Sequence, residues 1–297
     1  MRSPTTWLLA LGASLLLAPA AHADTILASA PGAENLGAAG GYAAWAAPAA
    51  QGRWKLVVRA PDGSVADAPV PTFGSAPDIS VGSDAFVQQQ IAIVYSRCAG
   101  SSATKACDVY SYNTNSKTER KVSGASSAGY SETSPSISSG RIAFVRRGGA
   151  RPGTYVAIPR FETKSMHVNR VDSHVAREVA VSQSRVVFLY RNANGQDDLT
   201  LAQLDGTRKR LIVRAKAGTI FSPVITRYKV GWLQRSGSDV LAKLTARINP
   251  STTKPDVRTG TRPLPASTDS ATADSSIITT YLDAEGVKRI SPAILHA

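Results

Sequence analysis

The sequence is poor in the side chains on which metal sites and nucleophilic catalysis most often depend. Its 297 residues include only 2 Cys, 4 His and 2 Met. The histidines after residue 23 are His167, His174 and His296, which are too scattered to suggest a metal site. A Gly-x-Ser-x-Gly motif, which exposes a nucleophilic serine in many hydrolases, is also missing. The sequence therefore predicts no catalytic residues, no metal site and no cofactor.

Sustained helical periodicity is missing as well. After the first 23 residues, no segment of about 12 residues or more repeats its apolar positions with the 3.6-residue period of a helix. Short stretches that mix Val, Ile, Thr and Tyr with polar residues are instead separated by Gly, Ser, Asn, Asp and Pro. No apolar run in this part is long enough to span a bilayer. The chain is therefore predicted to be almost entirely strand and turn, without a transmembrane segment.

A longer apolar run lies at the N-terminus. A weakly positive start precedes the apolar stretch Trp7–Leu17, and Ala21-His22-Ala23 supplies the small residues that signal peptidase accepts. A membrane anchor is the alternative, but the run is shorter than the roughly 20 residues that span a bilayer. We expect residues 1–23 to be removed as a secretory signal peptide. Residues 24–297 are then a single domain that is secreted or periplasmic.

The two cysteines flank a short loop of small residues. Cys98 and Cys107 follow and precede two predicted strands, Ile91–Tyr95 and Val109–Tyr112. A hairpin brings such ends within the roughly 4.4 to 6.8 Å that a disulfide requires between Cα atoms. The Cys-x-x-Cys spacing of redox pairs is absent. We predict a Cys98–Cys107 disulfide, which agrees with an oxidising compartment.

A repeat is the most informative feature of the chain. An apolar strand, a short turn and a second apolar strand recur about every 44 to 51 residues. When the copies are superimposed, Phe144, Phe188 and Trp232 share one column and Pro135, Val179 and Pro223 share another. Four short strands per repeat at this period are typical of a β-propeller. The aromatic column, together with Trp45, is expected to form the core between blades.

The number of repeats predicts how the ring closes. We expect an all-β, six-bladed β-propeller of four-stranded antiparallel blades, with five or seven blades as the alternatives. The last predicted strand, Val287–Ser291, is the third of its blade, and the segment Thr25–Ala30 belongs to no other blade. The N-terminal strand is therefore predicted to complete the last blade, which removes an open sheet edge.

The repeat also resembles a known family. The sequence Ser134-Pro135-Ser136-Ile137-Ser138-Ser139-Gly140-Arg141-Ile142-Ala143-Phe144-Val145, followed by the strand at Tyr155-Val156, is similar to the repeat of TolB-like β-propellers. Residues 76–247 carry most of the likeness. The resemblance implies a propeller that docks other proteins of the cell envelope. Related propellers stand beside hydrolase domains, and we expect none attached here.

Positive charge exceeds negative charge, with 34 Lys and Arg, 21 Asp and Glu, and a formal net charge of +13. The densest groups are Arg146-Arg147 with Arg151, and Arg208-Lys209-Arg210 with Arg214 and Lys216. Successive side chains of a strand point to opposite faces, so the second group is expected to be a solvated rim. An anionic wall polymer or lipid headgroups fit a basic surface. Aromatic residues are not interleaved with these cations, so no dedicated nucleic-acid site is predicted.

The segment Asn192–Asp198 carries oxygen-bearing side chains around Gly195. It lacks the full Asp-x-[Asp/Asn]-x-[Asp/Asn]-Gly run and the distal Glu of a calcium loop. We interpret it as the polar tip of a hairpin.

Propeller geometry indicates where a binding site is to be sought. The loops that enter the innermost strands crowd around the mouth of the central channel. They contribute Tyr130, Glu132, His174, Arg177, Glu178, Phe221 and Asp269 as candidate binding residues. The alternative is that these side chains only satisfy turns and cover the edge of the core.

Two functions are compatible with these sequence features. The first is a non-catalytic binding or scaffold protein, expected to be monomeric, that docks an envelope or extracellular protein or polymer on one propeller face. The second is a propeller enzyme, a hydrolase or lactonase-like, with its site in the central channel. A lactonase-like site needs several inward carboxylates, for which the sequence offers Asp78, Glu178, Asp269 and Glu34.

Overall fold

The computed structural model describes most of the chain. The described residues are 28–30, 32–99, 106–160, 163, 165–226, 229–237, 239–245, 257–259, 269–273, 276–282 and 288–293. From residue 257 onward, the description covers the backbone of the strands. The predicted signal peptide, residues 1–23, lies outside the described residues.

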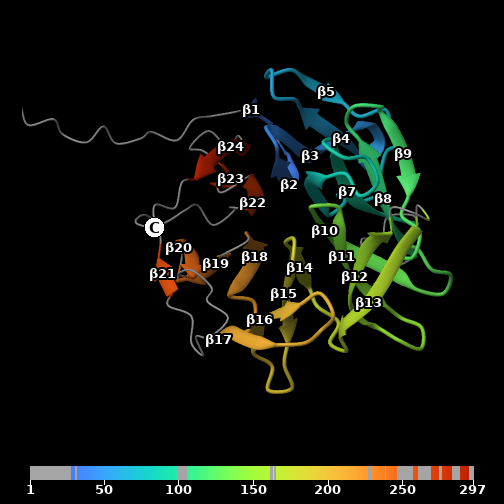
Figure 1. Ribbon diagram of the computed structural model, residues 1–297. Coiled ribbons are helices and arrows are strands. Elements are labelled where there is room, and N and C mark those ends of the chain that lie inside the picture. Colours follow the sequence, from blue (N-terminus) through green and yellow to red (C-terminus); the bar gives the residue numbers. More distant parts are fainter. Residues whose placement is uncertain are drawn as a thin grey trace, which may run out of the picture.

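The described strands pair into six four-stranded antiparallel sheets arranged around a central axis (Figure 1). Five of these sheets consist of consecutive strands and are called blades one to five. Blade one contains β2 (Glu34–Ala39), β3 (Tyr42–Pro48), β4 (Trp54–Arg59) and β5 (Val65–Asp67), with the short 3-10 helix η1 (Ala50–Gly52) between β3 and β4. Blade two contains β6 (Ile79–Ser83), β7 (Ile91–Cys98), β8 (Cys107–Asn113) and β9 (Thr118–Lys121).

Blades three to five follow the same plan. Blade three contains β10 (Ser131–Ser138), β11 (Arg141–Arg147), β12 (Gly153–Arg160) and β13 (Ser165–Asp172). Blade four contains β14 (Glu178–Val181), β15 (Arg185–Arg191), β16 (Asp197–Gln203) and β17 (Arg210–Ala215). Blade five contains β18 (Ile220–Ile225), β19 (Val230–Ser236), β20 (Asp239–Thr245) and β21 (Val257–Thr259). In each blade the first strand lies nearest the axis (Figure 1).

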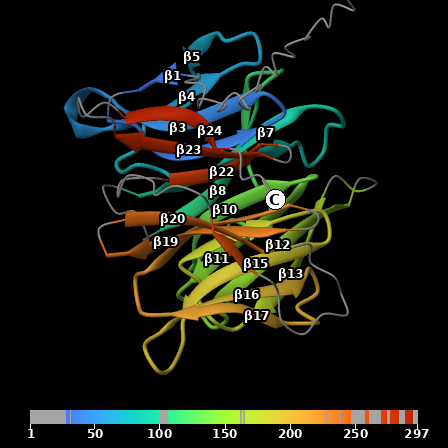
Figure 2. The ribbon, with the colours of Figure 1, turned by 90° about the vertical axis from the view of Figure 1, so that its left-hand side faces the viewer.

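The remaining sheet joins both ends of the chain. Its strands are β22 (Asp269–Ala273), β23 (Ser276–Leu282), β24 (Lys288–Ala293) and β1 (Ala28–Ser29). β1 pairs antiparallel with β24, as the sequence predicts for the N-terminal segment. Seen from the side, this sheet lies between blades one and five (Figure 2). The prediction of a propeller built from four-stranded antiparallel blades is confirmed.

The core lies between neighbouring blades. Apolar runs such as Ile142–Val145 and Val186–Leu189 are buried on both faces of their strands, because each blade is covered on both sides. Phe144 packs with residues of blade two, and Phe188 packs with residues of blade three. The predicted aromatic column is confirmed as inter-blade core, with relative exposure of 0 to 3% for Trp45, Phe144, Phe188 and Trp232. Replacing one of these aromatic residues by Ala is expected to cost about 3–5 kcal/mol.

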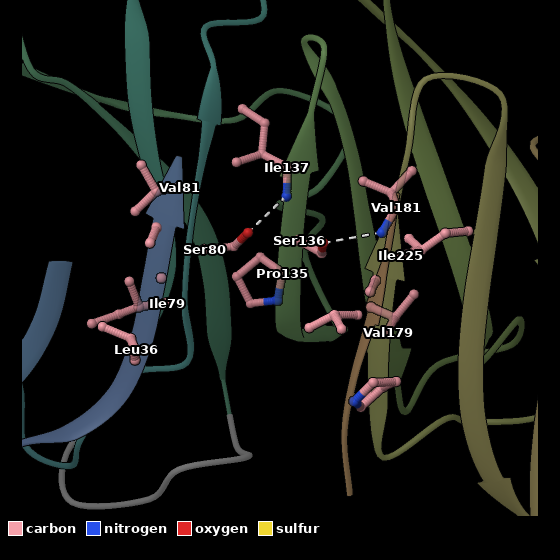
Figure 3. Close-up of a pocket in the computed structure, with 15 residues that line it drawn as sticks. Leu36, Ile79, Ser80, Val81, Pro135, Ser136, Ile137, Val179, Val181 and Ile225 are labelled. Atoms are coloured by element: carbon pink, nitrogen blue, oxygen red, sulfur yellow. Dashed lines mark hydrogen bonds between the residues drawn. The ribbon is translucent and has the colours of Figure 1, made fainter. Parts of the chain in front are cut away.

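The innermost strands surround a cavity of about 100 Å³ whose lining residues are mostly apolar. Leu36, Ile79, Ile137, Val181 and Ile225 are among its lining residues (Figure 3). Hydrogen bonds between blades tie the strands together around it. Ser80 Oγ accepts from the Ile137 N–H at 3.1 Å, and Ser136 Oγ accepts from the Val181 N–H at 3.1 Å (Figure 3).

Close packing of the inner strands explains the glycine in β6. A Cβ atom on Gly82 would lie 2.5 Å from the carbonyl oxygen of Ile137, so a side chain at this position would push blades two and three apart. The predicted disulfide is also confirmed. Cys98 and Cys107 are cross-strand partners in blade two and are bonded, with a Cα–Cα distance of 3.8 Å, which is shorter than the expected range.

Candidate binding face at the channel mouth

The ring has two ends, and the candidate binding residues predicted from the sequence lie at one of them. We call this end the mouth face; there the first strand of each blade begins and the second strand ends. The antiparallel pairing of β10 with β11 places Glu132 opposite Arg146, and the pairing of β18 with β19 places Ile220 opposite Gln234. The start of each inner strand therefore lies beside the end of its neighbour.

Two inward carboxylates of the mouth face bind the backbone of the next blade. Asp78 Oδ2 accepts from the Ser134 N–H at 2.9 Å, and Glu178 Oε2 accepts from the Ser222 N–H at 2.6 Å. Ser134 and Ser222 both have a positive φ, of 50° and 48°, within irregularities of β10 and β18 that turn their N–H groups toward the neighbouring blade. Ser134 Oγ in turn donates to the Arg177 carbonyl at 2.9 Å. These carboxylates therefore join blades two to three and four to five.

Tyr130 and Glu132 form a second group with Arg146. The guanidinium of Arg146 lies over the Tyr130 ring, 4.8 Å from its centroid, and donates to Glu132 Oε1 at 3.1 Å. Glu132 has 0% relative exposure, and its Oε2 atom has no hydrogen-bond partner in the described part of the chain. Burial raises the pKa of Glu132 despite the neighbouring Arg146. Glu132 therefore supports Arg146 from below and does not reach the surface.

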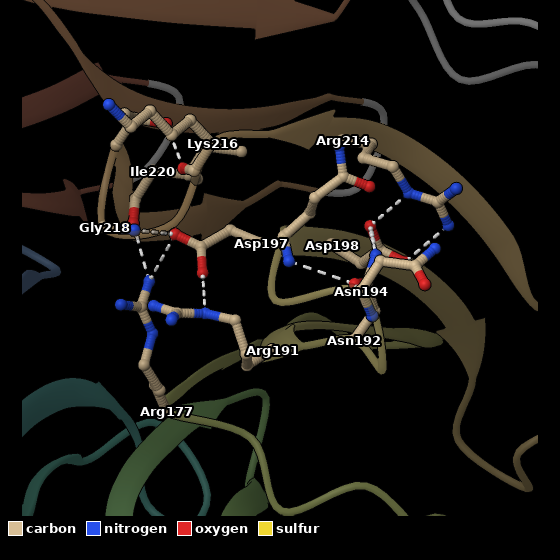
Figure 4. Close-up of polar contacts among 12 residues, drawn as sticks. Arg177, Arg191, Asn192, Asn194, Asp197, Asp198, Arg214, Lys216, Gly218 and Ile220 are labelled. Atoms are coloured by element: carbon tan, nitrogen blue, oxygen red, sulfur yellow. Dashed lines mark hydrogen bonds and ion pairs between the residues drawn. The ribbon is translucent and has the colours of Figure 1, made fainter.

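Arg177 belongs to a third group, centred on Asp197 (Figure 4). Asp197 is fully buried at the start of β16. Its Oδ1 accepts from Arg191 Nε at 2.9 Å, and its Oδ2 accepts from the Gly218 N–H at 2.6 Å and from Arg177 Nη2 at 3.2 Å. Arg177 Nη2 also donates to the Ile220 carbonyl at 2.9 Å. One buried carboxylate thus orients two guanidiniums of the mouth face.

Asp198 is the neighbouring acidic residue and holds a third arginine. Arg214 donates to it through Nε at 2.7 Å and through Nη2 at 2.8 Å, and Asn192 Nδ2 donates at 3.0 Å (Figure 4). The hydrogen bonds from Arg214 lower the pKa of Asp198, although its burial acts in the opposite direction. The oxygens of Asp197 and Asp198 are thus taken up by arginine, asparagine and backbone donors. This arrangement favours the hairpin-tip interpretation of Asn192–Asp198 over a calcium loop.

His174 lies between blades three and four. Its ring stacks on Tyr190 with centroids 4.2 Å apart, and its Nδ1 is 2.6 Å from Asp172 Oδ1. Lys209 approaches Asp172 Oδ2 at 2.5 Å. Burial alone would raise the pKa of Asp172, but the hydrogen bonds from Lys209 and His174 outweigh it and the pKa is lowered. His174 is thus held against an aromatic ring and a carboxylate.

The sequence-predicted residues share one face but form several separate groups. Tyr130 and Glu132 lie at blade three, His174 between blades three and four, and Arg177 with Glu178 at blade four. Phe221 lies in β18, where the Arg235 guanidinium stands 4.9 Å from its ring centroid. Asp269 begins β22, and its side chain lies outside the described residues. Among the residues that the structure describes, no three His, Cys, Asp or Glu side chains gather as they would around a metal ion.

A column of arginines joins these groups and was not predicted from the sequence. Arg147, Arg191 and Arg235 end, or nearly end, the second strands of blades three, four and five, each three residues after the buried aromatic of its blade. The spacing is 44 residues in both intervals. The signal was present in the repeat, since the same superposition that aligns Phe144, Phe188 and Trp232 also aligns these arginines.

Comparisons with known proteins support the fold. The sequence matches no family model and no curated protein. A puromycin-hydrolysing peptidase from Mycobacterium tuberculosis matches in structure with a TM-score of 0.56, 9% identity, and coverage of 89% of this chain and 52% of that one. The lectin of Aleuria aurantia, solved with α-methyl-L-fucoside, matches with a TM-score of 0.53, 9% identity, and coverage of 92% and 93%. TolB from Acinetobacter baumannii is also among the matches, with a TM-score of 0.45, 12% identity, and coverage of 81% and 60%.

These likenesses define the class of protein: the chain is a β-propeller, the fold that the TolB-like resemblance implied. At these identities they show the fold alone. The chain spans about half the length of the puromycin-hydrolysing enzymes that it matches. In the part of the chain that the structure describes, no helix is both long and apolar enough to cross a membrane.

Proposed function

We propose that the protein is an exported, non-catalytic binding module that docks an envelope or extracellular protein or polymer on its mouth face. In this proposal residues 1–23 are the cleaved signal peptide. The sheet of β1 and β22–β24 completes a six-bladed ring, and the domain acts as a monomer.

The observation that carries the proposal is the contrast between the channel and its mouth. The cavity between the inner strands measures about 100 Å³, whereas pockets for small-molecule substrates usually measure about 300–1,000 Å³. Its described lining is formed by short aliphatic side chains, Pro, Gly and two Ser. The inward carboxylates Asp78 and Glu178 do not line it and instead accept hydrogen bonds from backbone N–H groups. These features favour recognition on the mouth face over chemistry in the channel.

The composition of the mouth face also supports docking. It presents guanidiniums next to aromatic rings, as in the pairs Arg146 with Tyr130 and Arg235 with Phe221. Arg, Tyr and Phe are enriched in protein interfaces. The buried Asp197 and Asp198 hold two other arginines of the mouth face, Arg191 and Arg214, in place before any partner binds.

The test is capture with a variant of the mouth face. Immobilised protein, residues 24–297, is incubated with envelope and culture-medium fractions and washed at low and then moderate salt. The triple variant Tyr130→Ala/Phe221→Ala/Arg235→Ala should lose a partner that the wild type retains. Arg177 is left intact in this variant because it binds the buried Asp197.

The matched control removes exposed charge from the opposite end of the ring. Lys117 lies in an exposed turn before β9, and the exposed Arg160 ends β12, both away from the mouth face. Lys117→Ala/Arg160→Ala should retain the partner. If both variants capture it equally well, or if neither variant nor wild type captures anything, the proposal is wrong. Thermal unfolding of each variant confirms that the ring is intact.

A further inference from the structure

The arginine column of blades three to five forms a regular array on the mouth face. Arg147, Arg191 and Arg235 occupy the same position in three consecutive blades. Counting from the buried aromatic of each blade, Pro48 takes this position in blade one and Cys98 in blade two. The array therefore covers one side of the ring only. We call it the arginine arc.

Around the arc, most positive side chains are exposed and most negative side chains are buried. Arg191 has 45% of its side chain exposed and Arg235 is exposed, whereas Asp197 and Asp198 are buried. Asp197 is shared by Arg177 and Arg191, which leaves one positive charge uncompensated at that site. The exposed Lys216 adds another. Beside the arc, Asp239 is the exposed acidic side chain among the described residues, so exposed cations outnumber exposed acidic side chains there.

Contacts within the protein hold the three arginines in place. Arg191 donates to Asp197 through Nε, which directs the outer nitrogens of its guanidinium away from the buried carboxylate. Arg235 is held over the Phe221 ring at 4.9 Å. Arg147 is half-buried and donates through Nη2 to the Ala176 carbonyl of the next blade at 3.1 Å. Fixed guanidiniums lose little conformational entropy when an anion binds them.

We propose that the arginine arc binds a linear polymer whose repeating unit carries a phosphate, such as a poly(glycerol phosphate) chain. The inference rests on the proposed function, because it names the partner of the mouth face. An array that repeats with the blade matches a ligand whose anionic groups repeat along its length. A phosphodiester offers two non-bridging oxygens per unit to the forked donors of Arg and keeps its charge at all physiological pH values.

The test measures binding of purified poly(glycerol phosphate) to the full domain as a function of salt concentration. Binding should weaken with salt, because polymer counterions are released on association. Arg191→Gln/Arg235→Gln should weaken binding at least tenfold and reduce the slope of log K against log salt by about 0.7 per arginine lost, the value for flexible single strands. Lys117→Gln/Arg160→Gln, with the same change in net charge, should leave both quantities near those of the wild type.

Two further variants keep the test decisive. Arg235→Gln alone leaves the Asp197 pair intact and should still reduce the slope, even if the double variant is unstable. Arg191→Lys/Arg235→Lys retains the charge and should recover the slope but only part of the affinity, because Lys lacks the forked geometry.

Other outcomes overturn the inference. Equal losses in the arc variant and in the opposite-face control would mean that net charge alone attracts the polymer. Preference for poly-glutamate would assign the arc to an acidic polypeptide, and preference for phosphatidylglycerol vesicles would assign it to a lipid surface. If the triple variant of the mouth face loses a captured protein while poly(glycerol phosphate) does not bind, the proposed function stands and this inference fails.

Discussion

In blades two and four, different interactions close the hairpin between the second and third strands. In blade two, Cys98 and Cys107 are cross-strand partners and are joined by a disulfide. In blade four the same place, three residues after the buried aromatic, is occupied by Arg191, which faces Asp197 across the strands. The disulfide carries no charge, whereas the ion pair buries a carboxylate and exposes a guanidinium. At this position, therefore, the ion pair places an exposed guanidinium on the mouth face and the disulfide does not.

The largest loss of stability is expected when the ion pair of blade four is removed. Asp197→Ala removes the acceptor of Arg177, Arg191 and the Gly218 N–H. The free energy of unfolding should fall by about 3 kcal/mol, near the lower limit for a broken buried pair, because the two arginines can turn to water. Denaturant titration measures it. Asp197→Asn, which keeps the shape and one acceptor, should cost less; equal stability of wild type and Asp197→Ala would contradict the assignment.

Removing the disulfide of blade two should lower the stability slightly less. For the loop between Cys98 and Cys107, with a sequence separation of 9, Cys98→Ser/Cys107→Ser is expected to cost about 2.5 kcal/mol. A reductant should destabilise the wild type by the same amount and leave the double variant unchanged. Asp197→Ala should remain sensitive to the reductant, since the two closures lie in different blades. A wild type insensitive to complete reduction would show that the bond is dispensable.

Acid should distinguish the disulfide from the ion pairs that Asp198 and Asp172 form. The folded-state pKa values of Asp198 and Asp172 are lowered, so the folded protein binds fewer protons than the unfolded chain as the pH falls below about 4. Their contribution to stability is present above that pH and is lost as the pH falls through the folded-state pKa values. The disulfide is unaffected in this range. Measured from pH 6 to 2, the free energy of unfolding should decline less steeply for Asp198→Asn, which should already be about 1.5 kcal/mol less stable at pH 6.

The smallest change in stability is expected at Glu132, where the dependence of stability on pH has the opposite sign. Its pKa is raised above 4.5, so the folded protein binds more protons than the unfolded chain between 4.5 and the folded-state pKa. Stability from this group is full below 4.5 and falls as the pH rises through the raised pKa. Glu132→Gln should abolish this decline and change stability at pH 7 by less than about 1 kcal/mol. A pH profile identical to that of the wild type would show that folding does not shift the pKa of Glu132.

Much of the fold could be predicted because its signals are local and periodic. Phe144, Phe188 and Trp232 recur at one position, and the repeat itself requires that position to face a neighbouring blade. The disulfide followed from two cysteines at the ends of one hairpin. β1 was recognised because the last blade lacked a strand.

The site was harder to predict because its contacts join distant residues. Asp197 looks like part of a polar hairpin tip, and its burial depends on Arg177 and Gly218, which lie 20 and 21 residues away. Glu132 was assigned to a loop, but it lies within β10 and is buried beneath Arg146. The bond from the Ser222 N–H to Glu178 spans 44 residues and exists only once two blades are packed. Such pairings are set by the ring, not by any segment of it.

The pairing of β1 with β24 sets a condition on biosynthesis. The two strands stand at opposite ends of the strand order, yet they are neighbours in one sheet. While the chain emerges from the ribosome or from an export channel, β1 appears first and must wait until β24 has followed. The early blades can pack as they emerge, but this sheet is completed last. A chain that stalls before β24 would therefore present an unpaired β1 and an unfinished sheet, a form that quality-control proteases can distinguish from the finished ring.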